Sequence, residues 1–254
     1  MDSLKTWHDY FLRNRAGGAI NWDAPDGLTR EEKARIGKSV AAFQLGEYSE
    51  GKGLMKAATA FAQKHGCPDL IPITRLFIGE EQRHALLLKR FMDRHGIAPL
   101  KKNWADAVFR RLRKNVGFEP SVSVLITAEI ISLVYYRALR RGTGSDLLRQ
   151  ICDKILADEM AHTEYESALL NHLRRRRPAA ARKLIVWLHQ FLLLGTIAAV
   201  YWGHKAVLNR GGYNFSRFFA ACWLEFSDRF VPAIVVRATA NLYQPDYSEA
   251  AGKK

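Results

Sequence analysis

Apolar residues recur at helical spacing along most of the chain, and stretches that alternate apolar and polar residues are scarce. Spacings of three and four residues place apolar side chains on one face of a helix, whereas strict alternation is typical of a half-buried strand. Ala, Leu, Arg, Lys and Glu, which all favour helices, are frequent. The chain is therefore predicted to be all-α.

Start and stop residues predict a helical hairpin in the first half of the chain. Thr29 as N-cap and Glu32 three residues later have the form of a capping box at the start of a long helix over 30–65. A second helix is expected over 70–95, and Gly96 follows it as a typical C-terminal residue.

A second hairpin is expected further along the chain. A crossing segment over 97–119, with a short basic helix, leads to a third helix that begins near Pro120 and ends near Arg141. Ser145 caps a fourth helix that ends near Arg177. Two hairpins joined by a crossover are one of the standard connectivities of a four-helix bundle.

The pattern changes after Pro178. Residues 184–200 contain few polar side chains and are borderline for spanning a bilayer; a buried helix that covers the bundle, or a dimer interface, explains them as well. An aromatic-rich helix is expected beyond 209–212. The predicted organisation is a lead-in with weak helical character over 1–28, a four-helix bundle over 29–177 and a C-terminal helical extension over 178–254.

Composition and charge indicate the setting of this fold. Cys67, Cys152 and Cys222 form no CxxC pair, which argues against a disulfide framework and for a reducing compartment. The first residues contain no apolar run typical of a secretory signal. A cytoplasmic protein is therefore expected, with membrane association as an alternative. The formal net charge of +14 attracts acidic partners, among them proteins, lipid headgroups and nucleic acid.

Two short motifs fall on the second and fourth predicted helices. Glu81 is followed three residues later by His84, and Glu159 by His162. Residues i and i+3 point to one face of a helix, and the apolar neighbours indicate that this face is buried. From 13 Glu and 8 His, chance alone predicts about 0.4 such matches in the chain. Because a buried carboxylate without a partner is costly, a metal ion held by both residue types is predicted.

The other two helices of the predicted bundle each offer a carboxylate. Glu129 lies in an otherwise apolar stretch, 30 residues before Glu159. Glu50 is preferred on the first helix because it precedes Glu81 by 31 residues, while Glu47 is an alternative ligand or a supporting residue. Surface ion pairs with Arg and Lys are the competing interpretation. The predicted metal ligands are Glu50, Glu81, His84, Glu129, Glu159 and His162.

This set resembles the ligand pattern of the ferritin-like di-iron carboxylate superfamily. The resemblance covers about residues 30–177, and the stretches EEQRHALLLKRF and ICDKILADEMAH look most like acyl-carrier-protein desaturases and also like rubrerythrins. It implies two iron ions, or a manganese–iron pair, with Glu81 and Glu159 as the bridging and catalytic carboxylates.

Three further residues gain roles from this resemblance. Desaturases and related monooxygenases carry an acid near this place that orients a ligand histidine of the opposite helix, so Asp158 is expected to support His84, and Glu80 to support His162. Ser132 lies where desaturases have a hydroxyl residue that helps to handle oxygen. A solvent-facing position for either acid, or a serine that simply faces the core, is the alternative.

The resemblance implies a dioxygen-activating oxidoreductase that desaturates or hydroxylates an acyl chain or another apolar substrate. A rubrerythrin-like peroxidase or iron-handling protein, a di-iron tRNA hydroxylase and a scaffold without turnover are the alternatives. The expected partners are an acidic electron donor or acyl-carrier protein, a membrane surface at the C-terminal helices, and a second copy in a homodimer. Nucleic acid is not expected, because no aromatic-basic recognition motif is found.

Overall fold

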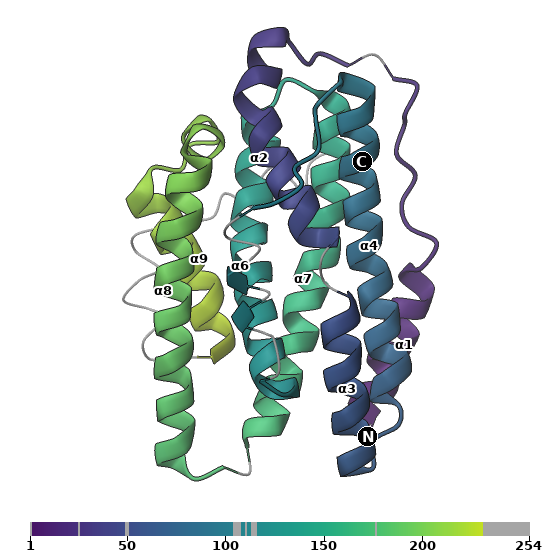
Figure 1. The fold of residues 1–254 in the computed structure, drawn as a ribbon, viewed down its shortest axis with the longest axis vertical. Coiled ribbons are helices and arrows are strands. Elements are labelled where there is room, and N and C mark those ends of the chain that lie inside the picture. Colours follow the sequence, from purple (N-terminus) through teal and green to yellow (C-terminus); the bar gives the residue numbers. More distant parts are fainter. Residues whose placement is uncertain are drawn as a thin grey trace, which may run out of the picture.

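The computed structural model describes residues 2–24, 26–48, 51–103, 108–109, 111–112, 116–175 and 177–230. In this part of the chain the regular secondary structure is α-helical and contains no strand, which confirms the all-α prediction (Figure 1). The helices are α1 (Asp2–Asn14), α2 (Arg30–Tyr48), α3 (Gly51–His65), α4 (Leu70–His95), α6 (Phe118–Gly142), α7 (Asp146–Arg174), α8 (Ala179–Arg210) and α9 (Phe215–Phe230).

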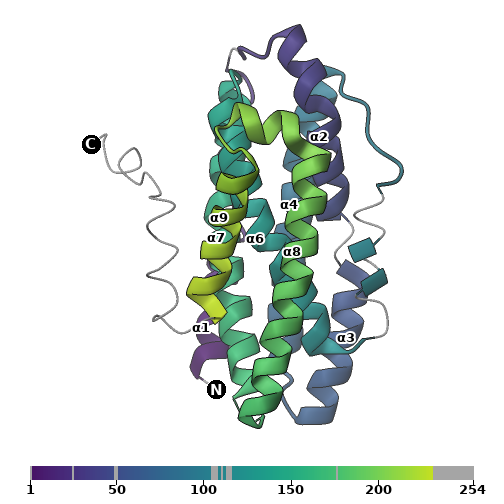
Figure 2. The same cartoon turned by 90° about the vertical axis from the view of Figure 1, so that its left-hand side faces the viewer.

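The helices form an elongated bundle whose long members run roughly parallel to its longest axis (Figure 1). The helix α6 occupies the interior and packs against α3, α7, α8 and α9. On one side, α4 contacts α1, α2, α3 and α7, and on the other side α8 and α9 pack against each other. Figure 2 shows α8 and α9 side by side on one face of the molecule.

Several helix ends lie where the local sequence predicted them. The helix α4 spans Leu70–His95, and Gly96 follows it in the left-handed conformation with φ 60° and ψ 40°. The Ser145 side chain accepts a hydrogen bond of 2.9 Å from the backbone N–H of Leu148 and so caps α7. The α7 helix ends at Arg174, slightly before the predicted Arg177.

The first predicted helix differs from the structure. The expected helix over 30–65 is found as α2 and α3, and residues 49 and 50 between them lie outside the described residues. Thr29 caps α2 by accepting from the Glu32 backbone N–H at 3.1 Å. The Glu32 carboxylate does not complete a capping box, since it accepts from Thr143 Oγ1 and the Gly144 N–H on the α6–α7 connection. Most of the predicted basic helix within 97–119 also lies outside the described residues.

The N-terminal segment is more ordered than its sequence predicted. Residues 2–14 form α1, which packs against α4. Phe11 is almost completely buried, and its ring lies 5.4 Å from that of Tyr165 and 5.9 Å from that of His162, measured between centroids. These aromatic contacts with distant parts of the chain stabilise a helix that its own residues favour only weakly.

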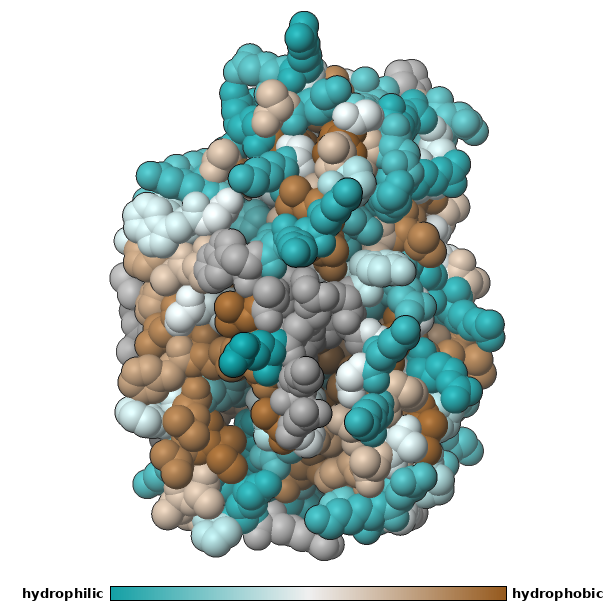
Figure 3. Space-filling view, viewed as in Figure 1, coloured by the Kyte–Doolittle hydropathy of each residue, from teal (hydrophilic) through white to brown (hydrophobic). Residues whose placement is uncertain are grey.

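Two helices, α6 and α8, are long and apolar enough to cross a membrane. The apolar window of α6 is 83% buried inside the protein, as expected for a core helix, whereas that of α8 is only 33% buried. Hydrophobic surface gathers on the left-hand side of the molecule in Figure 3, where α8 lies in Figure 1. The two helices are similarly apolar, but α6 is a buried core helix and α8 is largely exposed.

Candidate metal centre

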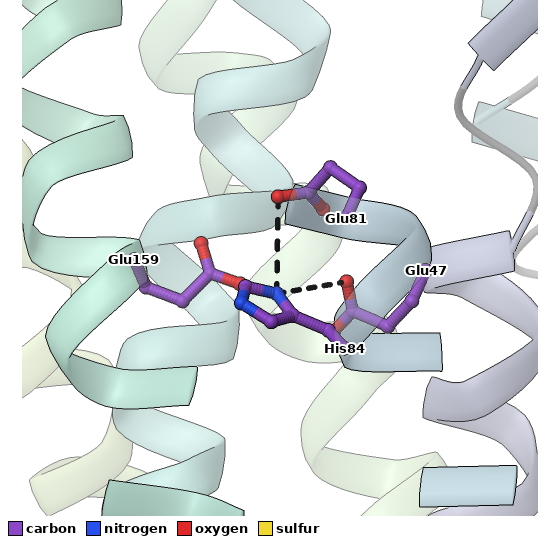
Figure 4. Close-up of side chains that lie close together, drawn as sticks. All are labelled: Glu47, Glu81, His84 and Glu159. Atoms are coloured by element: carbon purple, nitrogen blue, oxygen red, sulfur yellow. Dashed lines mark ion pairs between the residues drawn. The ribbon is translucent and has the colours of Figure 1, made fainter. Parts of the chain in front are cut away.

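Four helices direct acidic and imidazole side chains to one buried point of the bundle. Glu47 comes from α2, Glu81 and His84 from α4, Glu129 from α6, and Glu159 and His162 from α7. Figure 4 shows Glu47, Glu81 and Glu159 around the imidazole of His84. The exposed fraction of these six residues ranges from 0% to 8%. The surface ion pairs considered for the two motifs are therefore not what the structure contains.

Two overlapping groups of four residues could each hold a metal ion. In each group the oxygen and nitrogen atoms that can act as ligands lie within 4.8 Å of one another. Glu81 and Glu159 belong to both groups, so each can offer one oxygen to either position. The first group is Glu47, Glu81, His84 and Glu159, and the second is Glu81, Glu129, Glu159 and His162.

The Nδ1 atoms of both histidines face these carboxylates. His84 Nδ1 lies 3.5 Å from Glu159 Oε1 and 3.9 Å from Glu81 Oε1. It also lies 3.9 Å from Glu47 Oε2 (Figure 4). His162 Nδ1 lies 2.8 Å from Glu81 Oε1 and 3.4 Å from Glu159 Oε2. Both imidazoles therefore contribute to one continuous cluster.

The opposite nitrogens of the two rings bind acids on the facing helix. His84 Nε2 lies 2.9 Å from Asp158 Oδ2, and His162 Nε2 lies 2.9 Å from Glu80 Oε2. A carboxylate at this position accepts the Nε2–H proton, which leaves the Nδ1 lone pair directed at the cluster. The structure thus brings together the same histidine and acid pairs that the sequence resemblance implied, and it buries both acids.

Sequence reasoning missed Asn14, a residue of α1 that links the two supporting acids. Its Nδ2 donates to Glu80 Oε1 at 2.9 Å and to Asp158 Oδ1 at 2.8 Å. Lys154 Nζ donates to Asp158 Oδ1 at 2.6 Å, and Arg83 pairs with Glu80 at 2.9 Å. No local motif marks Asn14, because its partners are 66 and 144 residues away in the sequence.

On α2 the structure places Glu47 in the cluster. The preferred candidate Glu50 lies outside the described residues. Glu47 precedes Glu81 by 34 residues, so the equal spacing that favoured Glu50 does not hold for the acid found in the cluster. The Tyr136 hydroxyl donates to Glu47 Oε1 at 2.7 Å and orients it.

Burial and mutual repulsion alter the ionisation of the cluster. Burial, then the charges of Glu81 and Glu159, raise the pKa of Glu47 well above its ordinary value, and the same causes raise that of Glu129. Burial acts to lower the pKa of His84, but the hydrogen bond with Asp158 and the nearby carboxylates of Glu159 and Glu81 outweigh it and raise this pKa to about 10. Without a cation, the cluster therefore retains protons that a metal ion would displace.

The unsatisfied atoms of the cluster fit a metal site. Among the described residues, Glu81 Oε1, both Glu159 oxygens and the two histidine Nδ1 atoms are buried without a hydrogen-bond partner. The 2.8 Å between His162 Nδ1 and Glu81 Oε1 is a close approach whose geometry is not that of a hydrogen bond. Buried polar atoms without partners are rare and costly, and oxygen and imidazole donors together suit first-row transition metals.

A cavity of about 120 Å³ adjoins the cluster. Glu47, Glu81 and Glu129 contribute to its wall, and α2, α6 and α8 supply mainly apolar residues such as Phe43, Leu125 and Val200. Ser132 also lines this cavity, and its hydroxyl donates to the backbone carbonyl of Glu129 at 3.0 Å. An apolar molecule in the cavity would lie directly beside three of the cluster carboxylates.

The histidines of α8 contact hydroxyl groups outside the cluster. His189 Nε2 lies 2.9 Å from Thr127 Oγ1, and His204 Nδ1 lies 2.7 Å from Ser39 Oγ. Burial lowers the pKa of His189 to about 3 and that of His204 to about 4, so both are neutral near neutral pH. Among the described residues, neither histidine belongs to a group of side chains that could hold a metal ion.

Comparison with known proteins gives no assignment: the chain matches no protein-family model and no curated protein. The function is therefore inferred from the geometry of the cluster and of the cavity beside it.

Proposed function

We propose that this chain is a di-iron, dioxygen-activating oxidoreductase of ferritin-like fold that desaturates or hydroxylates an acyl chain or another apolar substrate. The observation that carries the proposal is the pair of four-residue groups that share Glu81 and Glu159. Four carboxylates and two histidines from four helices, with an i, i+3 Glu–His pair on each of two helices, are the ligand set of di-iron and di-manganese carboxylate bundles.

The residues divide naturally between two metal positions. Glu47 and His84 would hold one ion, and Glu129 and His162 the other. Glu81 and Glu159 belong to both groups and would bridge. When bound, a pair of ferrous ions supplies the redox and Lewis-acid chemistry with which dioxygen is reduced. Electrons for each turnover must come from an external donor, and the basic surface of this chain suits an acidic one.

The protein's own contribution is to fix the ligands and to keep water away. Asp158 and Glu80 hold the imidazoles in one tautomer, and Asn14 holds both acids. The Tyr136 hydroxyl fixes Glu47 through its hydrogen bond. Because the cluster is almost fully buried, its side chains are shielded from bulk water.

The cavity favours an organic substrate over peroxide alone. Its wall is mainly apolar where α2, α6 and α8 meet, and it touches Glu47, Glu81 and Glu129. A small polar oxidant does not need such a surface, whereas part of an alkyl chain does. Ser132 lies on the same wall, at the side of Glu129.

Metal binding and oxygen consumption test the proposal. Purified protein, made metal-free and reduced, should bind two ferrous ions per chain under anaerobic conditions, and then consume dioxygen faster when an apolar acyl substrate is present. Glu159→Gln should abolish the bridging position and lower the bound iron. Glu164→Gln, an exposed glutamate on the same helix, is the matched control. Binding of less than one iron per chain by the native protein would falsify the proposal, and peroxide consumption that no apolar substrate affects would favour the rubrerythrin-like alternative.

A further inference from the structure

One face of α8 is apolar and exposed along most of the helix. The first exposed residues recur at spacings of three to four, and the last follows eleven residues, about three turns, later, which places them all on a single stripe. Each side chain of the stripe is at least 54% exposed. From its first to its last residue the stripe is about 27 Å long at 1.5 Å per residue. The α8 stripe consists of Leu184, Trp187, Leu188, Phe191 and Trp202.

Basic residues flank the α8 stripe at both ends. Arg182 and Lys183 are exposed just before it, Lys205 is exposed three residues after it, and Arg210 is exposed at the end of α8, beyond a kink at His204. Between Lys183 and Lys205 the sequence contains no charged residue, and α8 as a whole contains no acid. Lys205 Nζ lies 5.5 Å from the centre of the Trp202 ring, so cation and aromatic ring are presented together.

We propose that α8 docks on a membrane surface with anionic headgroups and lies in the plane of the interface. Docking in this orientation would bury the exposed apolar face at the boundary of headgroups and acyl chains, while the flanking cations contact anionic lipids. Tryptophan is enriched at this depth, and the α8 stripe has Trp187 near one end and Trp202 at the other. In the space-filling view, hydrophobic surface is concentrated on this side of the molecule (Figure 3).

Charge argues against a second copy of the chain as the occupant. Two α8 helices that paired through their stripes would bring the basic ends together in either orientation. A parallel pair would place Arg182 and Lys183 against their own counterparts, and an antiparallel pair would place them against Lys205 and Arg210. Because α8 has no acid to compensate, both arrangements bring cations against cations.

The opposite face of α8 argues against a simple spanning helix. His189, Leu193, Ile197 and Val200 are buried against the rest of the protein, and His189 bonds to Thr127 of α6. A spanning role would require α8 to leave these contacts. Docking leaves them intact and covers only the residues that are already exposed.

The same helix connects the docking surface to the candidate centre. Thr196, Val200 and His204 on its inner face line the cavity beside the cluster. An apolar substrate dissolved in the bilayer would therefore need to pass only α8 to reach the cavity. This consequence rests on the proposed function, whereas the docking surface itself does not.

Vesicle flotation tests the docking surface. The native protein should float with vesicles of phosphatidylcholine and phosphatidylglycerol in equal amounts, bind vesicles of phosphatidylcholine alone more weakly, and be released from both by alkaline carbonate. Leu188→Gln should weaken binding about tenfold, because burial of one leucine side chain is worth roughly one factor of ten or more in affinity. Leu86→Gln, at a leucine that is 64% exposed on α4, should bind like the native protein.

Charge reversal is the second test of the docking surface. The double variant Arg182→Glu, Lys183→Glu should lose the preference for anionic vesicles. The control is the double variant Lys38→Glu, Lys64→Glu, which changes the net charge by the same amount on α2 and α3. It should retain most of the preference. Circular dichroism establishes that each variant is folded. All measurements use iron-free protein, so a failure of docking is separate from a failure of the metal site.

Four results would overturn the proposal. The native protein could remain unbound with anionic vesicles, or the α8 variants could bind as well as the native protein does. Sedimentation velocity could show a native dimer that Leu188→Gln dissociates, which would assign the stripe to a second copy. Retention of the protein in the bilayer after alkaline carbonate treatment would indicate that α8 spans the membrane.

Discussion

His84 on α4 is hydrogen-bonded through Nε2 to Asp158 on α7 at 2.9 Å, and this bond decides which nitrogen faces the cluster. Glu80 on α4 binds His162 on α7 in the same way, so each of the two helices orients the other's histidine. The relationship links the packing of α4 against α7 to the availability of two imidazole lone pairs. A metal site built in this way is as rigid as the contact between the two helices.

Replacing Asp158 tests that relationship. Asp158→Asn keeps the size of the side chain but removes the charge that holds the Nε2–H proton of His84. We expect ferrous-iron affinity to fall about 10- to 100-fold, as for other residues that orient metal-bound histidines. Anaerobic titration of the metal-free protein with ferrous iron measures this affinity. Asp153→Asn, an exposed acid on the same helix, should bind iron like the native protein, and equal losses for both variants would contradict the assigned role.

Asn14 is expected to contribute to stability as well as to metal binding. Asn14→Ala removes a donor shared by two buried carboxylates, which should lower the free energy of unfolding by about 1–3 kcal/mol. Urea denaturation of the iron-free protein measures this change. Gln63→Ala, at an exposed site on α3, should change stability by less than about 0.5 kcal/mol. An Asn14→Ala variant as stable as the native protein would show that other donors already satisfy both acids.

A ligand substitution should separate metal binding from folding. Burial and then the neighbouring carboxylates raise the pKa of Glu129, so Glu129→Gln resembles its protonated form. The iron-free variant should therefore be at least as stable as the native protein, while the gain in stability from added iron is lost. For the native protein that gain is about 2.7 kcal/mol when free iron is 100 times its dissociation constant. Thermal unfolding with and without ferrous iron measures the stability of the iron-free protein and the gain from iron. An equal gain in the variant would exclude Glu129 as a ligand.

His204 should make stability depend on pH in a predictable direction. Its ordinary pKa of 6.5 falls to about 4 in the folded protein because the ring is buried. The unfolded chain therefore binds the proton more readily, so the stabilising contribution of neutral His204 is complete above pH 6.5 and is lost as the pH falls toward 4. Over that window the loss amounts to about 3 kcal/mol.

Comparison with His204→Gln isolates this effect from that of other titrating groups. Urea denaturation of both proteins at a series of pH values should show a smaller loss of stability in the variant as the pH falls through the window. Parallel curves for the two proteins would mean that the folded His204 titrates normally. Ser39, its hydrogen-bond partner, is present in both proteins.

The cavity gives a prediction about substrate size. Val200→Phe adds volume to a cavity-lining side chain on α8 without touching a metal ligand. Iron binding should stay native, while substrate-stimulated dioxygen consumption falls for long acyl chains more than for short ones. The added bulk should cost about 1–3 kcal/mol of stability, which thermal unfolding monitors. If the variant processes long and short chains in the native ratio, the cavity is not the substrate site.

Local sequence determined the secondary structure where the deciding contacts are local. Gly96 ends α4 in a left-handed conformation that glycine adopts without strain, and Ser145 caps α7 through a hydrogen bond within one turn. The pairs of Glu81 with His84 and Glu159 with His162 follow from the helical repeat, which fixes the face on which residues i and i+3 lie. For these features no knowledge of the remaining chain was needed.

Only the tertiary structure decided how the site is completed. Spacing along the chain favoured Glu50, which lies outside the described residues; within them, the packing of α2 against α4 places Glu47 in the cluster and Tyr136 beside it. Asn14 and the exposed face of α8 likewise carry no local mark. The role of each depends on which surfaces meet after residues far apart in the sequence have packed. Because α8 is apolar on all sides, the helices that pack against it, rather than its own residues, decide which of its faces is buried.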